Sequence, residues 1–106
     1  MATVTEQTRT IAVGSDHAGY ELKQLVAEHL GARGLAVVDL GTDSTERVDY
    51  PDFGEAVGRA VVSGLADLGI AVCGSGLGIC MAANKVRGVR AATVHDATSA
   101  RLTREH

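Results

Sequence analysis

Aromatic residues are scarce in this sequence. They make up 3% of the 106 residues and comprise two tyrosines, one phenylalanine and no tryptophan. A core formed by this chain must therefore be aliphatic, built from valine, leucine, isoleucine and alanine. Basic charge is also in short supply, because the net charge is −3 at pH 7. Without a basic stripe or aromatic stacking residues, the composition argues against a nucleic-acid-binding protein.

Long apolar runs are missing as well. None approaches the roughly 20 residues needed to cross a bilayer, so we expect no membrane partner. Residues 1–9 are polar, without the apolar segment of a secretion signal, and we interpret them as a flexible leader. Cys73 and Cys80 are the two cysteines, and their spacing suits neither a disulfide framework nor a zinc site. We therefore expect reduced thiols in a cytoplasmic protein and no metal site.

Short apolar runs alternate with amphipathic segments through residues 10–106, which we interpret as a single domain. Apolar residues at helical spacing follow the first two runs. They are Leu22, Leu25, Val26, His29 and Leu30 in the first segment, and Phe53, Val57, Ala60, Val61 and Leu65 in the second. The predicted strands cover residues 10–14, 35–40, 69–73 and 90–95. The pattern is typical of an α/β fold with a parallel sheet covered by helices on both faces.

Ligands of such sheets bind at the carboxyl ends of the strands. The first loop at that edge, residues 14–19, holds Asp16 and His17 just ahead of a predicted helix. Because a helix start stabilises anions, His17 could contact a phosphate or a sugar hydroxyl while Asp16 accepts a hydrogen bond. The alternative is that Asp16 only caps the helix.

The second candidate site at that edge lies in residues 72–85, which read VCGSGLGICMAANK. A dinucleotide fingerprint would need a glycine where Ile79 stands, and it belongs on the first strand of its unit rather than the third. A Walker loop would need a Gly-Lys-Ser/Thr sequence that is absent here. What remains is a series of backbone N–H groups at a helix start, directly after Cys73.

This arrangement suits proton abstraction. A helix start stabilises a thiolate, and a thiolate of Cys73 could remove a carbon-bound proton. The glycine N–H groups could then stabilise the resulting enolate oxygen, with Ser75 bonding to the same oxygens. The alternative is that Cys73 is a small buried residue at a strand end. We interpret Cys80 as a core residue and Lys85 as a helix-terminating one.

Four motifs together carry a resemblance to a known family: GSDHAGYELK, GTDSTERVDYPDF, CGSGLGICMAANKVRGVRA and SARLTREH. From Ile11 to His106 the sequence resembles the type B ribose-5-phosphate isomerases, a family that includes galactose-6-phosphate isomerase subunits and allose-6-phosphate isomerases. The resemblance implies a Rossmann-like three-layer sandwich and a homodimer with its active site at the subunit boundary. It also implies aldose–ketose isomerisation through a cis-enediolate, without a metal or organic cofactor.

The resemblance also implies roles for individual residues. Cys73 would be the base, whereas some relatives use a glutamate at the position of Ile79. His106 would protonate the ring oxygen and open the furanose. Asp16 and His17 would bind the sugar phosphate, with Asp16 and Tyr50 near the ring. The anion hole for the enediolate would consist of Gly74, Ser75, Gly76, Leu77 and Gly78, and Ser75 would help to shuttle protons between the oxygens.

The C-terminal end departs from the family pattern. In the family, the histidine is followed by an asparagine, a fifth strand and a last helix that bring arginines to the phosphate. This sequence ends at His106, so we expect those elements to be missing. The favoured substrates are ribose 5-phosphate and ribulose 5-phosphate. The alternatives are a six-carbon aldose 6-phosphate, a non-catalytic phosphosugar-binding module, and a subunit active only in a hetero-oligomer.

Overall fold

The computed structural model describes residues 9–106. The predicted leader therefore lies, apart from Arg9, outside the described residues. Three strands, β1 (Thr10–Ser15), β2 (Ala36–Asp39) and β3 (Leu68–Val72), form one parallel sheet in the order β2-β1-β3. The central strand β1 is buried from Ile11 onward, as expected for a parallel strand covered on both faces.

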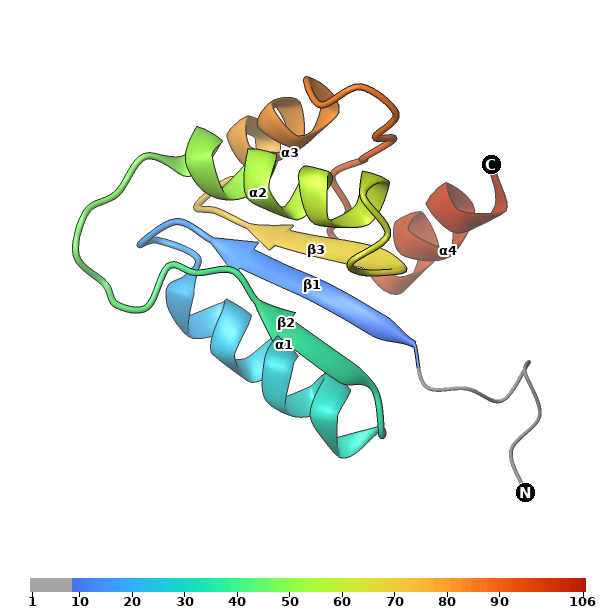
Figure 1. Cartoon of the computed structure of the whole chain (residues 1–106), viewed down its shortest axis with the longest axis horizontal. Coiled ribbons are helices and arrows are strands. Elements are labelled where there is room, and N and C mark those ends of the chain that lie inside the picture. Colours follow the sequence, from blue (N-terminus) through green and yellow to red (C-terminus); the bar gives the residue numbers. More distant parts are fainter. Residues whose placement is uncertain (1–8) are drawn as a thin grey trace.

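Helices cover both faces of this sheet. In Figure 1, α2 (Tyr50–Val62) and α3 (Leu77–Asn84) lie on one face and α1 (Tyr20–Ala32) lies on the other. The core under α2 is aliphatic, as predicted, and comprises Ala12, Val57, Ala60 and Ala66. The three-layer α/β architecture is thus confirmed. Within residues 9–106, none of the helices has the length and apolar character to cross a bilayer.

The last helix, α4 (Ala97–Glu105), begins at a capping box. Asp96 is the N-cap and accepts a hydrogen bond from the backbone N–H of Ser99 at 2.6 Å. This bond, with a second from the Ser99 side chain, holds the pKa of Asp96 below its usual value of 3.8. The helix itself contains no buried residue. Its position therefore depends on its cap and on the segment before it.

The face that α1 turns toward the sheet differs from the apolar face in the sequence pattern. Leu22 and Leu25 are 53% and 62% exposed, whereas Lys23 is 1% exposed. Lys23 lies inside because its ammonium group pairs with Asp39 at the end of β2, 2.7 Å from each carboxylate oxygen. A specific ion pair has thus set the rotation of the helix, overriding the hydrophobic periodicity.

The predicted fourth strand is absent: residues 90–95 form no strand in the described structure. A strand requires a backbone ladder, but this segment is held largely by side chains. Asn84 forms two hydrogen bonds with Ala91: its side chain donates to the carbonyl at 2.8 Å and accepts from the N–H at 2.7 Å. The hydroxyl of Thr93 donates to the carbonyl of Gly76 at 3.0 Å. The segment follows α3 and the glycine loop without joining the sheet.

We expect Asn84→Ala to release this segment from the end of α3. Loss of both hydrogen bonds to Ala91 should lower the free energy of unfolding by about 1–2 kcal/mol, at about 1 kcal/mol per bond. Urea denaturation measures this loss, and amide exchange at Ala91 localises it. Asn84→Asp, which keeps the acceptor and removes the donor, should have about half the effect. Unchanged exchange at Ala91 in Asn84→Ala would contradict this account.

Candidate functional site

The loops that follow β1 and β3 meet at the carboxyl edge of the sheet, as predicted. The backbone N–H of Asp16 donates to the carbonyl of Val72 at 3.2 Å. Gly19 packs so closely on the end of β3 that an added Cβ would lie 2.6 Å from the carbonyl carbon of Val72. Asp16 and His17 are therefore held next to the residue that precedes Cys73.

Cys73 lies directly after β3, with its sulfur at the start of α3. The backbone N–H of Gly76 donates to Sγ of Cys73 at 3.1 Å. Gly76 has φ +80°, a left-handed conformation that favours glycine and turns the chain into the helix. A donated hydrogen bond and a helix start both stabilise negative charge on the sulfur. Cys73 is a free, half-buried thiol at this position.

The glycine loop uses two of its own N–H groups internally. Gly76 donates to Cys73, and Leu77 donates to Oγ of Ser75 at 3.2 Å. In the described residues, no hydrogen bond is found for the N–H groups of Gly74 and Ser75, and that of Gly78 lies in the first helical turn, where N–H groups have no intrahelical partner. These three donors are the ones that could hold an anion.

Tyr50 and Ile79 occupy opposite environments beside this loop. Tyr50 begins α2, is 42% exposed, and packs its ring on Gly78, where an added Cβ would lie 2.7 Å from Cε1 of the tyrosine. Ile79 is 1% exposed and packs against Gly54 of α2. Tyr50 therefore lies against the glycine loop, whereas Ile79 is a core residue.

Asp16 and His17 both have structural contacts within the site. Oδ1 of Asp16 accepts the N–H of Gly19 at 2.9 Å, within the turn that precedes α1. The N-cap of α1 is Gly19 and has no side-chain cap, so Asp16 does not cap the helix itself. Nδ1 of His17 accepts the N–H of Val48 at 3.2 Å. This contact leaves the proton on Nε2, which is hydrogen-bonded to no other group within residues 9–106. His17 can therefore donate to an anionic or hydroxyl oxygen.

His106 lies far from this edge. Figure 1 shows the C-terminus near the amino ends of the strands, at the opposite end of the sheet from the glycine loop. Helix α4 buries no residue and ends at that side of the molecule. The carbonyl of His106 accepts a hydrogen bond from Arg90. Within one chain, the structure does not bring His106 to Cys73.

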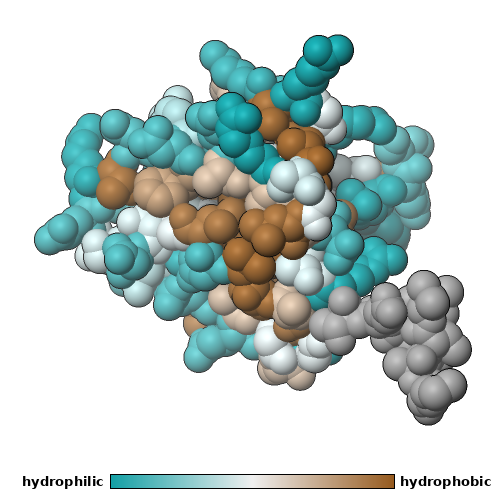
Figure 2. All heavy atoms as spheres, viewed as in Figure 1, coloured by the Kyte–Doolittle hydropathy of each residue, from teal (hydrophilic) through white to brown (hydrophobic). Residues whose placement is uncertain are grey.

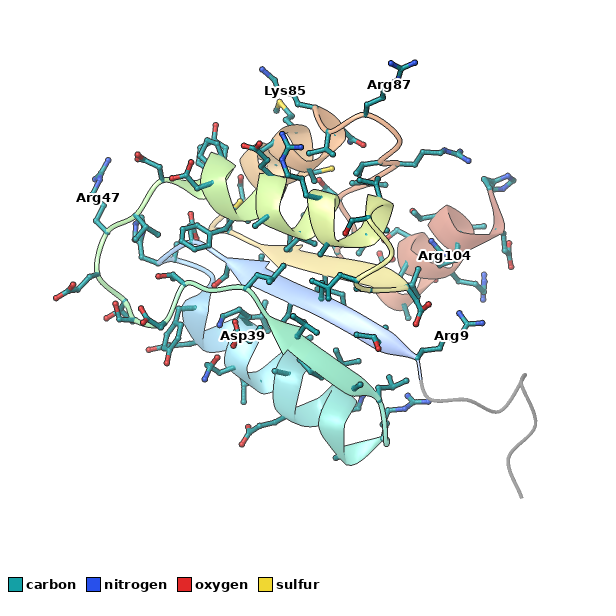
Figure 3. All side chains as sticks on the ribbon, viewed as in Figure 1. Arg9, Asp39, Arg47, Lys85, Arg87 and Arg104 are labelled. Atoms are coloured by element: carbon teal, nitrogen blue, oxygen red, sulfur yellow. The ribbon has the colours of Figure 1, made fainter. Side chains whose placement is uncertain are left out.

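Two features of the site were missed by the sequence analysis. The first is the Lys23–Asp39 pair, whose only sequence signal is a charged residue inside an amphipathic helix. The second is Arg47, which Figure 3 shows on the loop at the carboxyl edge, pointing outward, whereas Arg9 and Arg104 lie toward the other end. Lys85 and Arg87 point away from the molecule beyond α3. The basic residue in the loop sequence TERVDY would have indicated Arg47.

No cluster of three or more His, Cys, Asp or Glu side chains suited to a metal ion occurs in the described part of the chain. Cys73 and Cys80 are both free thiols, and Cys80 is half-buried on α3.

Residues 11–106 match the model of the family described as Ribose/Galactose Isomerase. The chain belongs to this family. It is 47% identical over 98 residues to ribose-5-phosphate isomerase B of Escherichia coli (strain K12), covering 92% of this chain and 66% of that protein. The chain thus spans just under two thirds of the length of this relative.

Solved structures agree with this assignment. Ribose-5-phosphate isomerase B of Clostridium thermocellum superimposes with a TM-score of 0.90 at 55% identity, covering 92% of this chain and 66% of that one. The enzyme of Mycoplasma genitalium, solved with bound ribulose 5-phosphate, has a TM-score of 0.86 at 46% identity, with coverages of 92% and 65%. The family resemblance inferred from the sequence is confirmed.

Proposed function

We propose that this protein is a sugar-phosphate isomerase that interconverts ribose 5-phosphate and ribulose 5-phosphate. The observation that supports this most strongly is the position of Cys73. Its sulfur accepts the N–H of Gly76 at the start of α3, on the same edge as Asp16 and His17. Relatives named ribose-5-phosphate isomerase B, one of them holding ribulose 5-phosphate, support the choice of substrate.

In the proposed reaction, the thiolate of Cys73 removes the proton from C2 of the open-chain aldose. The C–H electron pair becomes the C1–C2 double bond, and negative charge develops on O1 of a cis-enediolate. The N–H groups of Gly74, Ser75 and Gly78 would hold this charge. Cys73 then returns the proton to C1, and Ser75 passes the hydroxyl proton from O2 to O1. Atoms and charge balance without an added reactant.

The remaining site residues would bind and orient the sugar. Nε2 of His17 would donate to the phosphate, because Nδ1 is taken by the N–H of Val48. The ring of Tyr50 lies over the glycine loop, where the sugar would sit. Asp16 would accept from a sugar hydroxyl. Leu77 and Gly76 complete the loop by positioning its backbone.

We further propose that the protein is a cytoplasmic homodimer whose active sites lie at the subunit boundary. His106 of one chain is remote from Cys73 of the same chain, so a ring-opening role would require a second copy. Apolar side chains also remain exposed. Figure 2 shows them across the face that carries α2, where Val62 and Leu65 are 46% and 56% exposed beside a shallow groove. Such surfaces are typical of subunit contacts. The free thiols favour a reducing compartment.

Proton exchange at C2 tests the isomerase proposal. We expect ribose 5-phosphate incubated with the protein in D₂O to incorporate deuterium at C2 and to yield ribulose 5-phosphate, as followed by proton NMR. Galactose 6-phosphate and allose 6-phosphate are assayed in parallel, because the family includes isomerases of both kinds. Saturable binding without exchange of any of the three sugars would instead indicate a phosphosugar-binding module. Activity of the purified single chain would exclude an obligatory hetero-oligomer.

A further inference from the structure

Lys23 is the most deeply buried charged residue in the described structure, at 1% exposure. Its ammonium group lies 2.7 Å from both oxygens of Asp39 and 5.2 Å from the centre of the Tyr20 ring. Burying a lysine opposes folding unless the charge is paired. The partner carboxylate of Asp39 is 43% exposed, so it satisfies the buried charge from the border of the interior. From this position Asp39 can also contact the neighbouring loop.

The hydrogen bonds of Asp39 lead to the loop at residues 41–49. Oδ1 of Asp39 also accepts the N–H of Gly41 at 2.9 Å, at the point where the chain leaves β2. Gly41, at φ +99°, turns the chain, and its carbonyl accepts the N–H of Ser15 at 2.7 Å. Thr42 then donates to the carbonyl of Ser15 at 2.8 Å. The carboxylate thus fixes the first residues of the loop against the residue that precedes Asp16.

The far end of the same loop forms part of the candidate site. Val48 donates to Nδ1 of His17 and so sets the orientation of the imidazole. Two residues later, Tyr50 packs on Gly78 of the glycine loop. Figure 3 shows Asp39 on the sheet beside α1, while Arg47 projects from the loop at the carboxyl edge. The loop joins the Lys23–Asp39 pair to two residues proposed to bind the sugar phosphate.

The first part of this loop is held by packing and by polar contacts. Thr42 is buried, and Gly41 lies against the ring of Phe53. An open pocket of about 470 Å³ borders these residues and is lined by Tyr20, Phe53, Thr42 and Asp43 as well as by the ion pair. On the side of this pocket, the hydrogen bonds from Asp39 and Ser15 add to the packing.

We propose that the Lys23–Asp39 pair is a positioning element for the sugar-phosphate site, acting through loop 41–49 on His17 and Tyr50. Neither Lys23 nor Asp39 contacts the reacting atoms in this proposal. Their effect is on substrate binding, because the two residues that they position are binding residues and the base is on a different loop. The inference rests on the proposed isomerase function only where it predicts a change in KM.

Two variants of the full chain test the proposal. Asp39→Asn keeps the shape of the side chain and removes the charge. The double variant Lys23→Met with Asp39→Leu replaces the pair by apolar groups, which should preserve folding while removing the attachment of Gly41. For both variants we expect KM for ribose 5-phosphate to rise about tenfold with kcat changed less than about threefold. The reason is that displaced binding groups weaken the affinity for the substrate more than they slow the chemical step.

Amide exchange gives a readout that does not depend on activity. We expect exchange at Gly41, Thr42 and Val48 to accelerate at least about tenfold in the double variant, without a matching change in β1. The acceleration should be smaller in Asp39→Asn, because the amide oxygen can still accept the N–H of Gly41. Glu55→Gln is the matched control, because it breaks an exposed carboxylate–arginine pair with Arg59 on α2 that leads to no loop. It should leave KM and loop exchange unchanged.

The outcomes separate the two proposals. If the wild-type chain isomerises none of the three sugars while loop exchange accelerates in the variants, the isomerase function fails and the positioning role of the pair stands. If the folded double variant retains wild-type KM and wild-type exchange at Gly41 and Val48, the positioning role is overturned and the isomerase function is unaffected.

Discussion

Cys73→Ser is expected to lower kcat for ribose 5-phosphate isomerisation by at least about a hundredfold, the lower range for removal of a positioned base. Serine keeps the size of the side chain and can still accept the N–H of Gly76. Its hydroxyl, however, is far less acidic than a thiol and supplies almost no anion near neutral pH. KM should change little, because the binding groups lie on other loops. Steady-state kinetics with ribose 5-phosphate measures both constants.

Cys80→Ser is the matched control for this substitution. Cys80 lies half-buried on α3, beside Asn84 rather than at the start of the helix. Turnover should therefore remain near the wild-type value. Near-normal turnover in Cys73→Ser would remove Cys73 from the mechanism.

Mixing variants extends the test to the subunit boundary. Chains carrying Cys73→Ser and chains carrying His106→Ala should each be weakly active alone. If the active site combines Cys73 of one chain with His106 of the other, random dimers of the two variants regain about a quarter of the wild-type sites. The absence of any recovery after confirmed subunit exchange would contradict a shared site.

Gly19→Ala is expected to reduce both stability and activity. An added Cβ would lie 2.6 Å from the carbonyl carbon of Val72, and neither backbone can move without separating the β1–α1 loop from β3. Overpacking of this kind lowers the free energy of unfolding by about 1–3 kcal/mol. The shift also moves Asp16 and His17 away from Cys73, and a displacement of about 1 Å at an active site can cost a hundredfold in rate. Urea denaturation and kcat/KM measure the two effects.

Gly31→Ala is the control in the same helix. Nothing lies within 4 Å of a Cβ added at Gly31, and alanine is the better helix former. This variant should be equal to or more stable than the wild type, with unchanged kcat/KM. Equal behaviour of the two variants would show that the contact between Gly19 and Val72 does not limit the site.

The local features of the site were predictable from the sequence because they depend on residues close together in the chain. Continuous apolar runs separated by helical segments indicated a parallel sheet, and carboxyl ends of parallel strands share one edge. This placed Asp16, His17 and the glycine loop after Cys73 on the same side of the sheet. Ile79 stands where the dinucleotide fingerprint has a glycine, and this excluded the fingerprint for the same local reason.

Tertiary structure decided the features that depend on long-range contacts. The face of α1 is set by Lys23 and Asp39, which are 16 residues apart, and hydrophobic periodicity contains no information about such a partner. Residues 90–95 have the composition of a strand, yet a strand exists only where a neighbour supplies the ladder, and Asn84 supplies side-chain bonds instead. The sequence determined the three parallel strands and the place of Cys73 ahead of the glycine loop. Only the fold determined which helix face is buried, how loop 41–49 is attached, and that His106 lies at the opposite end of the sheet, because each depends on contacts between distant segments.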